Sequence, residues 1–140
     1  MPFTVGLALA LSAAFNTQAT EPALQTAPQA QTLKEYVVEY FADQPIMVDI
    51  AQCESHFRQF NKNGAVYRGT KNNQDVGVMQ INEHYHLDTA KKMGIDIYTI
   101  PGNVAYARYL FEKEGTVPWA SSEACWGKTQ NAKVLALASK

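Results

Sequence analysis

The sequence carries almost no net charge. Its 140 residues include 12 Lys and Arg against 13 Asp and Glu, a formal charge of −1, and no block of like charges occurs. A protein that binds DNA or RNA through phosphates normally shows a basic patch or stripe, so we expect no nucleic-acid partner. Because positive and negative side chains are nearly equal in number, net charge does not favour binding to other charged polymers outside a specific site.

The sequence also lacks an apolar run long enough to cross a bilayer, so we expect no stable membrane span. Residues 5–15 form a shorter apolar run, and the small-x-Ala triplet Thr17-Gln18-Ala19 follows it. We interpret residues 1–19 as a secretory signal peptide, although no Lys or Arg precedes the run; the alternative is a wrongly chosen start codon. Export would place the protein in the periplasm, the cell wall or the extracellular space.

Cysteine is scarce, with Cys53 and Cys125 the two in the chain. In an oxidising compartment two cysteines most simply pair, so an exported form is expected to contain a Cys53–Cys125 disulfide. This bond would close a loop of about 72 residues and stabilise the fold by roughly 4 kcal/mol if it acts on the entropy of the unfolded chain. Without export, two buried thiols are the alternative.

Metal-binding spacings are missing. His84 and His86 are two residues apart, which on a helix points two rings to different faces, and no Cys-x-x-Cys or His-x-x-x-His pair occurs. We therefore expect no metal and no other cofactor. His56 lies three residues after Cys53, a spacing that suits a cysteine nucleophile, but a disulfide would remove the thiolate.

A chain of this length suits one domain, which we expect to be monomeric. Residues 20–32 are rich in Gln, Ala and Pro and predict a flexible linker. The domain covers residues 33–128, and residues 129–140 form a tail with a weak helical pattern and no obvious partner. The pattern predicts an α+β fold, mainly α, with a helical lobe and a small β-lobe. Its expected elements are helices at 33–42, 45–55, 82–93 (capped by Asn82), 101–115 and 118–126, and an extended stretch at 76–81 after a turn-rich segment.

One carboxylate is unusually placed. Within the predicted helix 45–55, Pro45 suits the first turn, and Ile46, Ile50 and Glu54 recur at four-residue spacing on one apolar face. Glu54 is therefore expected in apolar surroundings, where ionisation is costly and the pKa of a carboxyl rises. A carboxylic acid that keeps its proton near neutral pH suits general acid catalysis. The alternative is a Glu that extends into solvent at a helix end.

Three motifs resemble the signature of lytic transglycosylases and goose-type lysozymes. They are Glu54-Ser55 at a helix end, the segment Gly-Val-Met-Gln-Ile-Asn at 77–82, and the helix containing Asn-Val-Ala-Tyr-Ala-Arg-Tyr-Leu at 103–110. The resemblance implies a lysozyme-like fold with a glycan groove between its two lobes. It also implies that the partner is a peptidoglycan strand, cleaved at the β-1,4 bond between N-acetylmuramic acid and N-acetylglucosamine.

The same resemblance assigns roles to individual residues. Glu54 is the expected catalytic acid, and a tyrosine near it is either Tyr106 or Tyr109. The expected contacts with substrate are Ser55, Gly77, Met79, Gln80, Asn82, Tyr106 and Tyr109. Aromatic rings stack on sugar faces, so Trp119, Tyr67 and Tyr85 are further candidates, while Trp126 is expected to pack beneath the site.

Asn82 departs from the lysozyme pattern, because goose-type lysozymes carry an Asp at the matching place. An amide cannot act as a base for water. Lytic transglycosylases need no such base, since their single Glu protonates the glycosidic oxygen and then takes a proton from the muramyl 6-hydroxyl, which closes a 1,6-anhydro ring. The sequence therefore favours a lytic transglycosylase. Asp75 is a possible second carboxylate, which leaves a hydrolytic lysozyme open; a non-catalytic glycan-binding wall protein is the other alternative.

Overall fold

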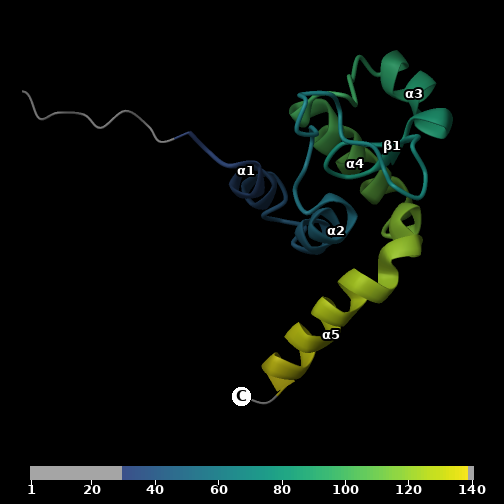
Figure 1. Ribbon diagram of the computed structural model, residues 1–140. Coiled ribbons are helices and arrows are strands. Elements are labelled where there is room, and N and C mark those ends of the chain that lie inside the picture. The colour runs from purple at the N-terminus through teal and green to yellow at the C-terminus, as the bar shows by residue number, and fades with distance from the viewer. Residues whose placement is uncertain (1–29, 139–140) are drawn as a thin grey trace, which may run out of the picture.

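The computed structural model describes residues 30–138, so the predicted signal peptide and most of the predicted linker lie outside the described residues. Figure 1 shows an arrangement dominated by helices, with one small sheet beside α3 and α4. The expected class, α+β and mainly α, is confirmed. The elements are α1 (Leu33–Tyr40), α2 (Ile46–Ser55), β1 (Asp75–Val76), β2 (Ile81–Asn82), α3 (Glu83–Lys92), α4 (Ile100–Glu114), the 3₁₀ helix η1 (Val117–Ser122) and α5 (Glu123–Ala138).

The helices α1 and α4 begin and end near their predicted positions because local signals fix their ends. Thr32 and Glu35 form a reciprocal capping box at the start of α1. At the start of α4 the Thr99 side chain accepts a hydrogen bond from Gly102 N, and Pro101 occupies the first turn. Gly115, with a positive φ, ends that helix.

The predicted extended stretch 76–81 is wrong, because the chain folds back within it. β1 and β2 pair antiparallel, with Asp75 opposite Asn82 and Val76 opposite Ile81. Gly77 and Gln80, at φ of 76° and 51°, lie in the left-handed region and turn the chain between the strands. This hairpin places Asp75, Gln80 and Asn82 on one small element.

The carboxyl-terminal region also differs from the prediction. Instead of a short helix at 118–126 and a tail from 129, η1 is followed by α5, which continues to Ala138. Gln130 and Lys133, both beyond the predicted domain boundary, hydrogen-bond to Asp49 on α2, with Lys133 Nζ 2.6 Å from Asp49 Oδ2. These contacts are polar, which explains why an apolar pattern did not reveal them.

A single apolar core joins α1, α2, the hairpin, α4 and the end of the chain. Its members include Phe41, Met47, Ile50, Val76, Met79, Tyr106 and Trp119, each at most 2% exposed. Beside the hairpin, Arg68 forms a two-pronged ion pair with Glu83, the first residue of α3, with N–O distances of 2.7 and 3.2 Å. Among the described residues, no helix combines the length and apolar character needed to cross a membrane.

Candidate active site

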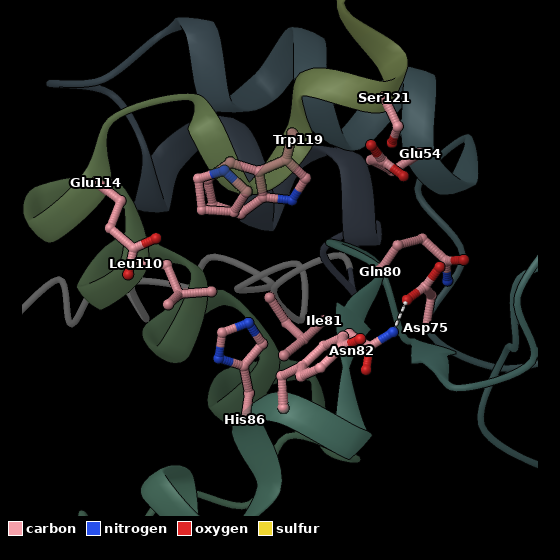
Figure 2. A pocket seen from close by; sticks show the side chains of 12 residues that line it. Glu54, Asp75, Gln80, Ile81, Asn82, His86, Leu110, Glu114, Trp119 and Ser121 are labelled. Atoms are coloured by element: carbon pink, nitrogen blue, oxygen red, sulfur yellow. Dashed lines mark hydrogen bonds between the residues drawn. The ribbon is translucent and has the colours of Figure 1, made fainter.

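Glu54 lies in the last turn of α2. Met47 and Ile50 on the same helix are buried and anchor it to the core, as the apolar stripe predicted. His56 and Phe57, at φ of 54° and 57°, turn the chain sharply away directly after Ser55. The helix therefore ends at Glu54 and Ser55, with the Glu54 carboxyl facing a cleft (Figure 2).

Burial is the main influence on the Glu54 carboxyl. Desolvation raises its pKa, a hydrogen bond from Ser122 opposes this, and the negative charge of Asp75 raises it further. The net result is a pKa above the ordinary value of a Glu side chain, in the direction predicted from the sequence. The carboxyl therefore keeps its proton to higher pH than a solvated Glu would.

Two adjoining cavities meet at Glu54 and form one cleft with two arms. The first arm has a volume of about 270 Å³ and the second about 400 Å³. Both are lined by Glu54, Asp75, Gln80 and Ser121. The first arm continues between α3, α4 and η1. Figure 2 shows Trp119 on the same side of this arm as Glu54, and His86 on the opposite side. The second arm continues along residues 67–72, where Tyr67 and Lys71 lie.

Asp75 faces the same cleft from the hairpin. Its Oδ1 accepts a hydrogen bond from Asn82 Nδ2 at 2.7 Å, drawn as a dashed line in Figure 2, and a longer one from Asn72 Nδ2 at 3.3 Å. Asn82 is the N-cap residue of α3, as predicted, but its side chain makes no capping hydrogen bond. Asn82 instead positions the second carboxylate, while also lining the first arm.

Buried amides fix the turn of the hairpin. Asn103 Oδ1 accepts from Met79 N at 2.8 Å, and Asn103 Nδ2 donates to Val76 O at 3.0 Å and to Ile97 O at 2.8 Å. Gln59 Oε1 accepts from Val78 N at 2.9 Å. Side chains from α4 and from the segment after α2 therefore satisfy the turn's backbone groups, which would be costly to bury unpaired.

Gly77 is required by this framework. Its φ of 76° favours glycine, and a Cβ at this position would collide with the side chains of Asn103 and Gln59. Ser55 Oγ donates to Val78 O at 2.7 Å, and both Ser55 and Met79 are fully buried. Ser55, Gly77 and Met79 therefore lie beneath the cleft and do not line it, whereas Gln80 does.

Neither predicted tyrosine lines the cleft. Tyr106 is 1% exposed, and its hydroxyl lies 3.2 Å from Nδ1 of His86, which does line the first arm. Tyr109 packs against Tyr106, with ring centroids 5.5 Å apart. Desolvation lowers the pKa of His86, which favours its neutral form. The third motif therefore contributes to the cleft through Leu110 rather than through its tyrosines, and His86 from α3 and Glu114 from the end of α4 line the same arm.

The tryptophans form a layer on the Glu54 side of the first arm. Trp119 lines the arm and donates from Nε1 to Met79 O at 2.9 Å, which ties η1 to the hairpin. Trp126 is 7% exposed and donates from Nε1 to Trp119 O at 3.1 Å, beneath the site as expected. Tyr85, at the first arm, is 74% exposed and presents an open ring.

The predicted disulfide is confirmed: Cys53 and Cys125 join the end of α2 to the start of α5. This bond brings Ser122, one helical turn before Cys125, close to Glu54. Sequence reasoning missed Ser122, and the only signal that pointed to it was this pairing. Within residues 30–138, no cluster of three or more His, Cys, Asp or Glu side chains is placed to hold a metal ion.

Comparisons of the chain with protein-family models, with curated proteins and with solved structures found no match.

Proposed function

We propose that the protein is an exported lytic transglycosylase that cleaves peptidoglycan strands between N-acetylmuramic acid and N-acetylglucosamine. The observation that carries the proposal is the Glu54 carboxyl, desolvated at the junction of two cleft arms and with a raised pKa. An acid at such a junction can protonate a glycosidic oxygen that bridges sugars bound in the two arms. The cleft, the disulfide and the sequence motifs agree with this proposal.

In the first step Glu54 gives its proton to the glycosidic oxygen, and the bond from that oxygen to the muramyl C1 breaks. Positive charge develops on the muramyl ring, and the negative charge of Asp75 in the same cleft stabilises it. In the second step the Glu54 carboxylate takes the proton of the muramyl 6-hydroxyl while that oxygen bonds to C1. The 1,6-anhydro ring closes, and Glu54 is again protonated.

Hydrolysis of the same bond is the second candidate, and the position of Asp75 favours it. Asp75 shares both arms with Glu54, and amide donors from Asn82 and Asn72 orient it. A carboxylate placed in this way can act as the base that activates water. The sequence argument from Asn82 against a lysozyme therefore loses weight, because Asn82 supports a carboxylate instead of replacing one.

The cleavage proposal is tested with dye-labelled peptidoglycan, comparing wild type with Glu54→Gln. We expect soluble dye to be released by wild type and not by the variant, while both sediment with insoluble peptidoglycan. Glu112→Gln, an exposed change on α4, is the matched control and should keep wild-type activity. Binding without release by wild type would contradict the proposal and favour a glycan-binding wall protein.

Mass spectrometry of the released muropeptides separates the two reactions. A 1,6-anhydro end is one water lighter than a hydrolysed, reducing end. We expect anhydro ends to dominate and to persist in Asp75→Asn. Mainly reducing ends that disappear in Asp75→Asn would identify the protein as a hydrolase with Asp75 as its base.

A further inference from the structure

Ser122 has two hydrogen-bond partners but only one hydrogen to donate. Its Oγ lies 2.6 Å from Glu54 Oε1 and 3.1 Å from Trp119 O. The Trp119 carbonyl has no hydrogen, so that contact forms only when the Ser122 hydroxyl donates. The contact with Glu54 can form in either direction, because a carboxyl donates when protonated and accepts when ionised.

The protonation state of Glu54 therefore sets where the Ser122 hydrogen points. With Glu54 protonated, Glu54 donates to Ser122 Oγ and the serine donates to Trp119 O, so both contacts exist together. With Glu54 ionised, the serine donates to the carboxylate, and a short O–H···O⁻ bond near 2.6 Å is expected for such a charged acceptor. No proton leaves the serine in either state.

The surroundings make this rotation inexpensive. The Trp119 carbonyl also accepts from Trp126 Nε1, so it keeps one hydrogen bond when Ser122 turns away. Trp119 is itself fixed by its indole bond to Met79 O. The Cys53–Cys125 disulfide holds the start of α5 against α2, so the distance from Ser122 to Glu54 does not depend on the hydrogen bond alone.

We infer that Ser122 is a positioning residue that holds the Glu54 carboxyl in place in both of its protonation states by turning one hydroxyl between Glu54 and Trp119. The inference rests on the proposed function, in which Glu54 acts first as acid and then as base. During the first step the hydroxyl turns from Trp119 to the new carboxylate, and during the second it turns back.

Other ionisable groups share the cleft and have to be separated from Ser122 in any test. Asp75 from the hairpin, His86 from α3, Glu114 from α4 and Lys71 from the second arm all line it. Of these, Asp75 contributes a charge that shifts the pKa of Glu54, in the direction opposite to Ser122. Removing the Ser122 hydroxyl should therefore raise the pKa of Glu54, whereas neutralising Asp75 should lower it.

The test compares wild type with Ser122→Ala, Ser122→Thr and Thr129→Ala. Thr keeps a hydroxyl at the site, and Thr129→Ala removes an exposed hydroxyl from α5 as the matched control. The pKa of Glu54 is followed by ¹³C NMR with side-chain-labelled glutamate, with the resonance assigned from its absence in Glu54→Gln. The pH dependence of kcat and KM is measured on soluble, uncrosslinked peptidoglycan strands.

In Ser122→Ala we expect a higher pKa of Glu54 and a matching shift of the alkaline limb of the rate profile to higher pH. We also expect kcat to fall by about tenfold, with little change in KM. Ser122→Thr should restore the wild-type limb. An unchanged pKa and an unmoved limb in Ser122→Ala would overturn the inference, whatever the loss of activity. Ser122→Gly removes the same hydroxyl and replaces Ser122→Ala if that variant does not fold.

The two proposals fail separately. If wild type cleaves no glycan but the Glu54 pKa still rises in Ser122→Ala, the coupling between hydroxyl and carboxyl is supported and the enzymatic proposal is contradicted. If wild type cleaves glycan and the pKa of Glu54 is the same in wild type and in Ser122→Ala, the enzymatic proposal is supported and the role of Ser122 is disproved.

Discussion

Two of the carboxyl groups that line the cleft, Glu54 and Asp75, have different surroundings. Glu54, on the side of α2 and η1, is desolvated, which raises its pKa and favours the protonated form, while its hydroxyl partner Ser122 acts in the opposite direction. Asp75, on the hairpin side, accepts hydrogen bonds at Oδ1 from the side-chain amides of Asn82 and Asn72. The two carboxyl groups thus differ in their surroundings: burial raises the pKa of Glu54, whereas hydrogen bonds from two amides orient Asp75.

The two sides are also fixed by different means. The Glu54 side is fixed covalently by the Cys53–Cys125 disulfide and by the polar contacts of α5 with Asp49. The Asp75 side is a hairpin of two short strands, held by buried amides from Gln59 and Asn103. The supports of the two sides are therefore separate residues, which can be changed one at a time.

The largest effect is expected from removing the acid. Glu54→Gln should lower the rate of glycan cleavage by about a thousandfold, because the amide has no proton of suitable acidity. It should not destabilise the fold, since an amide keeps the shape and removes the cost of burying a charge. Denaturant unfolding at several pH values measures the second part.

The difference in unfolding free energy between Glu54→Gln and wild type should increase with pH. The folded protein binds the Glu54 proton more tightly than the unfolded chain, so wild type loses stability as pH rises from the ordinary Glu pKa to the raised one. Glu54→Gln lacks this loss, so its advantage should grow over that range. A stability difference that does not change with pH would contradict the raised pKa.

The next effect concerns the covalent link of the Glu54 side. The double variant Cys53→Ser, Cys125→Ser should lose about 4 kcal/mol of unfolding free energy, because the open chain gains entropy. Activity should fall as well, since Ser122 is no longer held near Glu54. A reducing agent should reproduce the loss in wild type and have no effect on the variant, which serves as its own control.

Removing the main support of the hairpin side should cost slightly less. Asn103→Ala leaves Met79 N, Val76 O and Ile97 O without their partner, which should lower the unfolding free energy by about 3 kcal/mol. Asn131→Ala, an exposed change on α5, should have almost no effect. Equal stabilities of the two variants by denaturant unfolding would show that the buried amide is dispensable.

The smallest effect is expected from Asp75→Asn, which tests how the charge of Asp75 influences Glu54. Asp75→Asn removes the negative charge that raises the pKa of Glu54, so the alkaline limb of the rate profile should move to lower pH. The rate itself should fall about tenfold if Asp75 only stabilises positive charge. Asp88→Asn, exposed on α3, is the control for charge alone. If the alkaline limb of the rate profile does not move in Asp75→Asn, the charge of Asp75 does not influence the pKa of Glu54.

Much of the Glu54 side could be predicted from the sequence because its signals are local. The four-residue spacing of Ile46, Ile50 and Glu54 marks the helix and its buried face. The disulfide followed from the count of cysteines. The hairpin around Gly77 was not predicted.

What the tertiary structure decided are the contacts between distant segments. Ser122 contacts Glu54 across 68 residues, the Asn82 side chain binds Asp75 and makes no capping hydrogen bond, and α5 contacts Asp49. Periodicity reports which face of an element is apolar, but it contains no information on which polar side chain will lie opposite another. The sequence by itself thus determined the helix that carries Glu54, the buried face of that helix and the cysteine pair. Packing determined which residues surround Glu54 and set its pKa, because desolvation and hydrogen bonding depend on neighbours that only the folded chain brings together.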